Sequence, residues 1–186
     1  MKPKERFQNR SREDLLDATY DLAANFEINS YSCSQCVVAA IHEVIGLEDS
    51  LVKAATSNCG GTAFQLLGAC GGLVGGIMAL DYFFGRPVER LSYEEIIPEN
   101  ITALFNAQAI ARELYNKYVE NYGAVNCGVL MNKLYGRMFY FEDPDEFKKF
   151  EAAGCHTDPS KCVGIVGNAA RWVMEILIDK GVVEVD

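Results

Sequence analysis

The sequence predicts a single all-α domain, a helical bundle with a buried, glycine-rich central helix. First, 49% of the 186 residues are hydrophobic, which is enough for one substantial core. Second, these residues recur at three- and four-residue intervals along nearly the whole chain, as in amphipathic helices, and no convincing pair of alternating strands is found. Third, no linker divides the chain and no segment repeats, so we expect one domain over residues 1–186, with residues 1–11 as a basic N-terminal arm.

Capping residues place the first three helices. Ser11 begins an S-x-x-D cap signal that precedes regularly spaced apolar residues. Gly46 is of the residue type that commonly ends a helix, and Asp49 or Ser50 can cap the helix that follows. We therefore expect helices at about residues 12–27, 32–46 and 50–58.

The next helix is the glycine-rich one. No charged residue lies between Lys53 and Asp81, a stretch long enough to suggest a transmembrane segment, but it contains seven glycines. Its helical part, at about residues 70–84, would be roughly 22 Å long at about 1.5 Å per residue, which is short of the ~30 Å hydrocarbon core of a bilayer. We therefore expect a buried central helix whose glycines let a neighbouring backbone, or a compact inorganic group, approach closely.

The second half of the chain continues the helical pattern. Asp143 with Pro144, and again Asp158 with Pro159, form pairs that commonly begin helices. The aromatic segment 135–141 could be extended. Apolar spacing and glycine stops predict helices at about residues 101–122, 126–134 and 159–181, and a further short helix is expected to begin at Pro144.

The charge of the chain argues against several kinds of partner. The formal net charge is −9, from 17 basic and 26 acidic residues, and this field opposes binding to nucleic acid or to anionic lipid. Five of the first twelve residues are basic, but no apolar segment of a secretion signal follows them. We therefore expect a cytoplasmic protein that binds no nucleic acid and does not span a membrane. In a reducing compartment, clustered cysteines more often bind metal or carry out redox chemistry than form structural disulfides.

Seven cysteines are present, an odd number that excludes a fully paired disulfide scaffold. Four of them fall at the expected starts of helices: Cys33, Cys70, Cys127 and Cys162. Unpaired N–H groups at a helix start favour negative charge, so each of these thiols is expected to have a lowered pKa and substantial thiolate character. Because helix starts can converge at one end of a bundle, we expect these four sulfur atoms to meet.

The other three cysteines, Cys36, Cys59 and Cys155, are candidates for redox roles. Cys36 forms a C-x-x-C motif with Cys33, Cys59 lies in a glycine-rich loop, and Cys155 precedes a histidine. The C-x-x-C motif lacks the following histidine of a haem attachment site, and the remaining spacings do not fit a structural zinc ribbon.

The histidines and the clustered tyrosines are expected to be structural. His42 lies in the middle of a predicted helix, and His156 is expected to be a loop histidine. Tyr115, Tyr118 and Tyr122 have the spacing of a helix-packing stripe. No Ser-His-Asp arrangement, phosphate-binding loop or dinucleotide fingerprint is present.

Four segments together resemble the C_GCAxxG_C_C family of redox-active proteins, over about residues 12–180: Cys33-Ser34-Gln35, the run from Cys70 to Gly76, Tyr122-Gly123 before Asn126-Cys127, and Cys162 before an amphipathic helix. The resemblance carries the four family cysteines onto Cys33, Cys70, Cys127 and Cys162. Gly72 stands where the family motif has alanine. The resemblance implies redox activity in a small helical protein, and iron and sulfur at the cysteine cluster of the related domain of split-Soret cytochromes. Their haem motifs are absent from this chain.

Three hypotheses follow for the function. In the first, the four family cysteines hold a [2Fe-2S] or [4Fe-4S] cluster that transfers electrons to a redox partner protein, and the other three cysteines extend the site or pack beside it. In the second, the protein is a metal-free dithiol–disulfide redox protein or sensor that uses Cys33 and Cys36. In the third, it is a helical interaction module with buried structural cysteines, whose glycine-lined helix and aromatic residues serve the packing of a homodimer.

Overall fold

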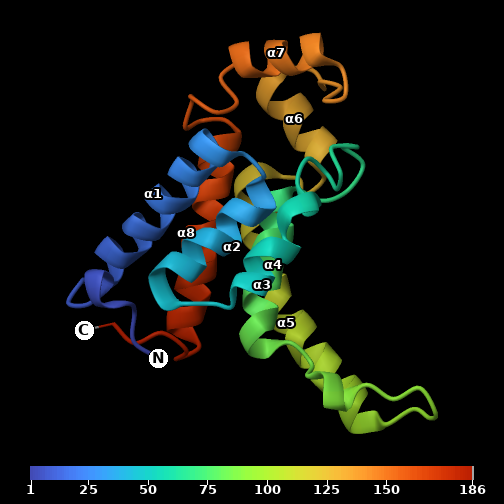
Figure 1. Ribbon diagram of the computed structural model, residues 1–186. Helices are drawn as coiled ribbons and strands as arrows, with labels where there is room; N and C mark the ends of the chain where they lie inside the picture. The colour runs from blue at the N-terminus through green and yellow to red at the C-terminus, as the bar shows by residue number, and fades with distance from the viewer. Residues whose placement is uncertain (186) are drawn as a thin grey trace.

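Eight α-helices build the fold that a computed structural model gives for residues 1–185 (Figure 1). No strand forms among these residues, and their one isolated β-bridge joins Ala69 to Asn126. The predicted all-α, single-domain class is therefore confirmed. The helices are α1 (Arg12–Ser30), α2 (Cys33–Ile45), α3 (Asp49–Ala54), α4 (Gly71–Phe84), α5 (Pro98–Tyr122), α6 (Cys127–Tyr135), α7 (Pro144–Ala152) and α8 (Cys162–Asp179).

The main hydrophobic core lies between α1, α2, α4, α5 and α8. Helix α8 packs along α1 and also contacts α2, α4 and α5 (Figure 1). Fully buried side chains come from each of these layers, among them Leu15 of α1, Ile41 of α2, Leu114 of α5 and Leu177 of α8. None of the helices within residues 1–185 combines the length and the apolar character needed to cross a membrane.

Helix α4 approaches α2 at backbone distance. A Cβ atom added at Gly75 would lie 2.2 Å from the carbonyl oxygen of Ser34 in α2. Only glycine fits at such a contact, so the glycine content of this helix sets how closely the two helices pack. Packing within the domain therefore explains the uncharged segment between Lys53 and Asp81, which contains most of α4.

A second, smaller cluster lies at one end of the bundle, beneath α6 and α7 (Figure 1). Its buried members are Leu66, Met131, Phe139, Phe150 and Cys155. The aromatic segment 135–141, which could have been extended, forms no strand and instead contributes rings to this cluster.

Three helix starts follow the predicted caps. Helix α3 does not, because it already begins at Asp49 without a side-chain cap, and it ends at Ala54 rather than near residue 58. The side chains of Ser11, Asn126 and Asp143 accept hydrogen bonds from backbone N–H groups in the first turns of α1, α6 and α7. The prediction for α8 is wrong at its start. The Asp158 carboxylate instead accepts hydrogen bonds from the N–H and the hydroxyl of Ser160, which makes a local turn, and the helix begins only at Cys162.

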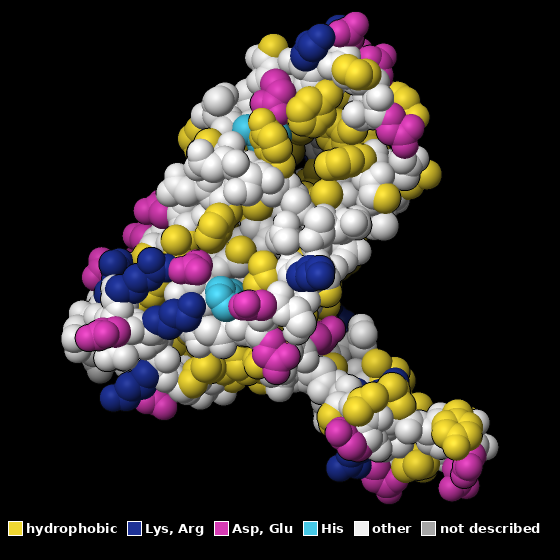
Figure 2. Space-filling view, viewed as in Figure 1, with side chains coloured by type: hydrophobic (Ala, Val, Ile, Leu, Met, Phe, Trp, Pro, Cys, Tyr) yellow, Lys and Arg dark blue, Asp and Glu magenta, His cyan; other side chains and the backbone are white. Residues whose placement is uncertain are grey.

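The two ends of the chain lie side by side, whereas the α4–α5 connection projects from the body (Figures 1 and 2). Phe7 of the basic N-terminal segment is buried, and the Lys4 N–H donates to the carbonyl of Val44 in α2 (2.8 Å). The projecting segment and the start of α5 expose hydrophobic side chains, including Val88, Leu91, Tyr93, Ile96 and Phe105.

Candidate functional site

The four predicted cysteines all lie at helix starts, as expected. Cys33, Cys127 and Cys162 are the first residues of α2, α6 and α8, and Cys70 immediately precedes α4. The four helices come from distant parts of the chain, so the bundle itself brings these cysteines together.

A short antiparallel contact holds two of these starts beside each other. The Cys70 N–H donates to the carbonyl of Val125 (2.7 Å), and the Cys127 N–H donates to the carbonyl of Gly68 (2.9 Å). The bridge between Ala69 and Asn126 lies between these two hydrogen bonds. Cys70 and Cys127 are therefore positioned by main-chain pairing as well as by their helices.

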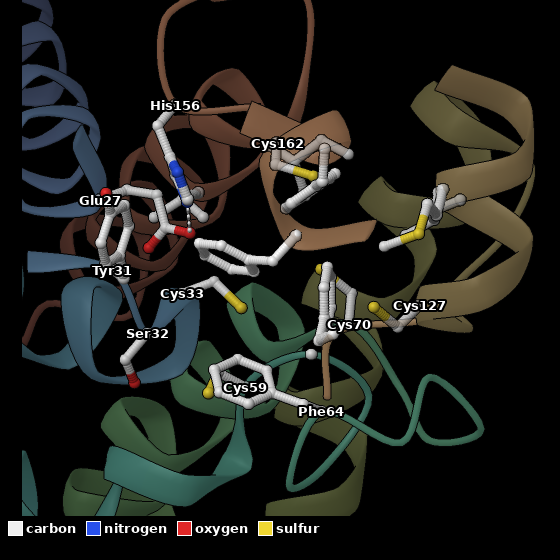
Figure 3. A pocket seen from close by; sticks show the side chains of 18 residues that line it. Glu27, Tyr31, Ser32, Cys33, Cys59, Phe64, Cys70, Cys127, His156 and Cys162 are labelled. Carbon is white, nitrogen blue, oxygen red and sulfur yellow. Dashed lines mark ion pairs between the residues drawn. The ribbon is translucent and has the colours of Figure 1, made fainter. Parts of the chain in front are cut away.

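The four cysteines line one cavity of about 270 Å³ between the main core and the smaller cluster, and Cys59 lines it as a fifth cysteine. Figure 3 shows their sulfur atoms arranged around a common space. The remaining lining is mostly apolar and aromatic, and Figure 2 shows a hollow ringed by hydrophobic side chains at this end of the molecule. The aromatic lining residues are Tyr31, Phe64, Phe141, Phe147 and Phe150.

The glycine that follows Cys70 keeps room for sulfur. A Cβ atom at Gly71 would lie 2.3 Å from the Cys33 sulfur and 2.9 Å from the Cys59 Cα. No side chain can be accommodated there without moving one of these groups. The Cys-Gly pair at the start of α4 is thus a requirement of the cavity.

The loop before α4 is conformationally strained where it borders the cavity. Five consecutive residues, 60–64, all have positive φ, between 49° and 71°. Residues other than glycine seldom adopt this region, and a β-branched residue such as Thr62 does so least readily. Strain of this kind collects at functional sites. Cys59 precedes this run, and its thiol donates to the carbonyl of Thr56 (3.5 Å).

The prediction that helix starts lower the pKa of these thiols is wrong. Burial raises the pKa of all seven cysteines, and that of Cys162 rises to about 12 even though the Tyr135 hydroxyl donates a hydrogen bond to its sulfur (3.2 Å). Removal from water disfavours the charged form more strongly than the helix N–H groups favour it. Nearby sulfur adds to the effect, since Cys70 raises the pKa of Cys33 and Cys127. In the metal-free protein these thiols are therefore protonated at neutral pH.

Two tyrosines reach the cavity sulfurs. The Tyr135 hydroxyl is the donor to Cys162, and the Tyr118 hydroxyl lies 3.9 Å from the Cys70 sulfur. Tyr118 also packs against Tyr122 and Trp172, as a helix-packing stripe requires. Tyr118 therefore packs between helices and also makes a polar contact with the site.

Cys36, the second cysteine of the C-x-x-C motif, turns to the main chain. Its thiol donates to the carbonyl of Tyr31 (2.7 Å), and it is buried. Burial raises its pKa as well. A buried, protonated thiol is a poor nucleophile, which weakens the case for a Cys33–Cys36 exchange pair.

His156 lies in the turn between α7 and α8. It is nevertheless buried, and it belongs to a cluster of polar side chains at the edge of the cavity. Its Nδ1 lies 2.7 Å from Oε1 of Glu151 and 3.2 Å from the sulfur of Cys155. Its Nε2 lies 3.8 Å from Oε1 of Glu27, a buried carboxyl whose pKa burial raises to about 7. Figure 3 shows Glu27 and His156 facing each other on one side of the sulfur atoms.

Sequence reasoning missed both glutamates. A signal for Glu27 was present, because it follows Thr19 and Ala23 at four-residue intervals on the buried stripe of α1. A carboxylate on such a stripe is unusual and points to a polar partner. Glu151 gave no such signal, since it belongs to a short, mostly exposed helix.

Comparison with protein families identifies one match. The C_GCAxxG_C_C family model, described as a putative redox-active protein, matches residues 31–176. This segment contains all seven cysteines and the whole cavity lining except Glu27. No curated protein and no solved structure matches the chain.

Proposed function

Because the chain belongs to the C_GCAxxG_C_C family of redox-active proteins, we propose that it binds an iron–sulfur cluster and transfers electrons, with the thiolates of Cys33, Cys70, Cys127 and Cys162 as ligands. One observation carries the proposal: four helix starts bring four cysteines to a single apolar cavity.

The donor set fits such a group. Four thiolates are the ligand count of both [2Fe-2S] and [4Fe-4S] clusters. A single metal ion needs donor atoms grouped around one point. Within residues 1–185, the potential ligand atoms that lie this close together belong to Glu151, Cys155 and His156, and the four cysteines are not among them. A cluster instead lies between its sulfur ligands, and the space next to Cys33 is kept open by Gly71.

Once metal has replaced the thiol protons, the groups around the sulfur atoms favour the negative charge of the thiolates. The backbone N–H groups of Gly72 and Leu73 hydrogen-bond to the Cys70 sulfur and act to lower its pKa, against the larger effect of burial. The Tyr135 hydroxyl does the same for Cys162. Hydrogen bonds to sulfur and low exposure to solvent are the factors by which a protein sets the potential of a cluster.

When bound, an iron–sulfur cluster supplies one-electron oxidation and reduction. This chain's own residues would orient the ligands and exclude water. Phe64, at 42% exposure, and Tyr31, at 44%, are the lining aromatics with the most exposed side chains. We therefore place the approach of a redox partner at these two rings.

The experiment is chemical analysis of protein purified without oxygen. We expect visible absorbance, with iron and acid-labile sulfide in equal amounts, and loss of both in Cys70→Ser. Cys36→Ser is the matched control, because it removes a buried thiol that hydrogen-bonds to the Tyr31 carbonyl, and it should retain iron. A colourless, iron-free preparation with seven titratable thiols contradicts the proposal. A dithiol that depends on Cys36 would favour the second hypothesis.

A further inference from the structure

Three chemically different donors meet at the end of α7 and the turn that follows it. One oxygen of Glu151, the sulfur of Cys155 and a ring nitrogen of His156 all lie within 4.8 Å of one another. Cys155 is fully buried and His156 is 7% exposed. We propose that these three residues bind a single divalent transition-metal ion of the Zn²⁺ type, at the edge of the cavity and without using Cys33, Cys70, Cys127 or Cys162.

The contacts of the imidazole favour a metal over a catalytic thiol. In a nucleophile–histidine–carboxylate triad, the nucleophile and the carboxylate use opposite ring nitrogens. Here Cys155 and Glu151 both approach Nδ1, at 3.2 Å and 2.7 Å. One nitrogen carries a single hydrogen or a single lone pair, so it serves both partners poorly. A cation at the meeting point would instead receive a lone pair from each of the three.

The types of donor and the distances between the donor atoms agree with the coordination of a zinc-like ion. Imidazole, thiolate and carboxylate are all ordinary Zn²⁺ ligands, with bonds of about 2.0–2.3 Å, so that tetrahedral donors stand roughly 3.5 Å apart. The sulfur–nitrogen separation is already close to this value. Glu151 must withdraw by less than an ångström, which its partly exposed side chain allows.

The opposite nitrogen of the imidazole supplies a second, independent observation. Glu27 is 4% exposed, and within residues 1–185 its Oε2 has no hydrogen-bond partner at ordinary distance and angle, although the neighbouring Cys36 thiol interacts with this carboxyl and acts to lower its pKa. Its other oxygen lies 3.8 Å from Nε2 of His156. Metal-binding histidines usually donate their second ring N–H to a carboxylate, which fixes the ring. The Glu27 carboxylate faces that nitrogen from 3.8 Å, which is longer than a hydrogen bond. The Tyr31 ring packs beside the imidazole, with centroids 4.2 Å apart and ring planes tilted by 45°.

The proposed ion would fix the turn that leads into Cys162. Cys155 and His156 lie between α7 and the first residue of α8. Bonds from the ion to these residues would therefore hold the smaller cluster against the bundle. Three protein donors are also the number found in zinc sites that keep an open coordination position. The site uses none of the four cavity cysteines, so either proposal can fail alone.

The test measures zinc in the intact chain, expressed with zinc and iron and purified without oxygen. We expect one zinc per chain, lost in Cys155→Ser and in His156→Gln while iron is retained, and a 10- to 100-fold weaker affinity in Glu27→Gln. His42→Gln is the matched control, since the polar partners of the His42 side chain are the Leu47 carbonyl and the exposed Asp49, neither of which belongs to the proposed site. Zinc that persists in both ligand variants, or an absence of zinc, overturns the proposal.

A second measurement separates this site from the cavity. The variant with all four cavity cysteines changed to serine, checked for helix content by circular dichroism, is titrated with Co²⁺. We expect one Co²⁺ with a thiolate charge-transfer band that disappears on adding Cys155→Ser. A band unaffected by that change contradicts the assignment. If the quadruple variant does not fold, the zinc and iron contents of the single variants decide the question.

Discussion

At the scale of single residues, the site depends on where side chains are absent as much as on where cysteines are present. Two adjacent glycines illustrate this. A Cβ atom at Gly71 meets a sulfur and a backbone atom, whereas one at Gly72 meets chiefly the hydroxyl of Tyr118, at 2.6 Å. The hydroxyl is the end of a side chain, which can shift more readily than backbone.

We therefore predict that Gly71→Ala prevents cluster binding, while Gly72→Ala, which restores the alanine of the family motif, retains it. Overpacking at Gly71 should also lower the free energy of unfolding by about 1–3 kcal/mol. The measurements are iron content and denaturant unfolding. Full iron occupancy in Gly71→Ala would contradict the close contact to Cys33.

The thiols themselves should be unreactive in the folded, metal-free protein. An ordinary cysteine has a pKa near 8.5, whereas that of Cys162 is about 12, so at pH 8.5 its thiolate fraction is roughly a thousandfold smaller. Alkylation of the native protein with iodoacetamide, followed by mass spectrometry, should be correspondingly slow at the cavity cysteines and rapid in denaturant. Fast modification of Cys33 in the native state would support a dithiol mechanism instead.

The sign of these pKa shifts could not have been predicted from the sequence. A cysteine after a capping residue identifies a helix start, and Asn126 did so correctly for Cys127. Whether that start faces water or an apolar cavity depends on the packing of other helices. The same holds for His156, whose partners Glu27 and Glu151 lie 129 and 5 residues away along the chain and are joined to it only by the tertiary fold.

At the scale of elements, helix starts and their connections set the positions of the ligands. The Asn126 side chain caps α6 and also donates to the carbonyl of Leu67 (2.6 Å). It therefore joins the start at Cys127 to the loop that leads to Cys70. Local signals of this kind predicted that each helix exists, but several bounds differ, as at the start of α5 and the end of α3. Asp158 shows one reason, because a nearer partner, Ser160, satisfied the same carboxylate.

Asn126→Ala should thus affect both stability and the site. Loss of a cap commonly lowers the free energy of unfolding by about 1 kcal/mol, and here the Cys70–Cys127 spacing should loosen as well. We predict reduced iron occupancy. Ser11→Ala is the matched control, since it removes the cap of α1, which bears none of the four cysteines, and should lower stability without loss of iron. Equal iron contents in the two variants would contradict the role given to the Asn126 side chain.

At the scale of the whole molecule, the cavity separates two hydrophobic clusters of unequal size. The main core lies mainly between α1, α2, α4, α5 and α8, while the smaller cluster combines aromatic and aliphatic side chains near α6 and α7. A group bound by cysteines from α2, α6, α8 and the start of α4 would join the two. Ligand binding stabilises the conformation that forms the site.

Removal of metal should therefore loosen one end of the molecule more than the rest. In hydrogen–deuterium exchange, we predict faster exchange without metal in residues 59–70 and 136–161, and little change in the centres of α1 and α8. Those two helices pack along each other and share ion pairs between Arg171 and both Glu13 and Asp17. Uniform loss of protection along the whole chain would contradict this division.

The central claim is that four cysteines hold iron and sulfide in the cavity. It is tested by iron K-edge X-ray absorption of protein purified without oxygen. We expect iron surrounded by sulfur alone, with a second shell of iron that is lost in Cys70→Ser and kept in Cys36→Ser. Iron bound mainly by oxygen and nitrogen, or protein that takes up no iron, would contradict it.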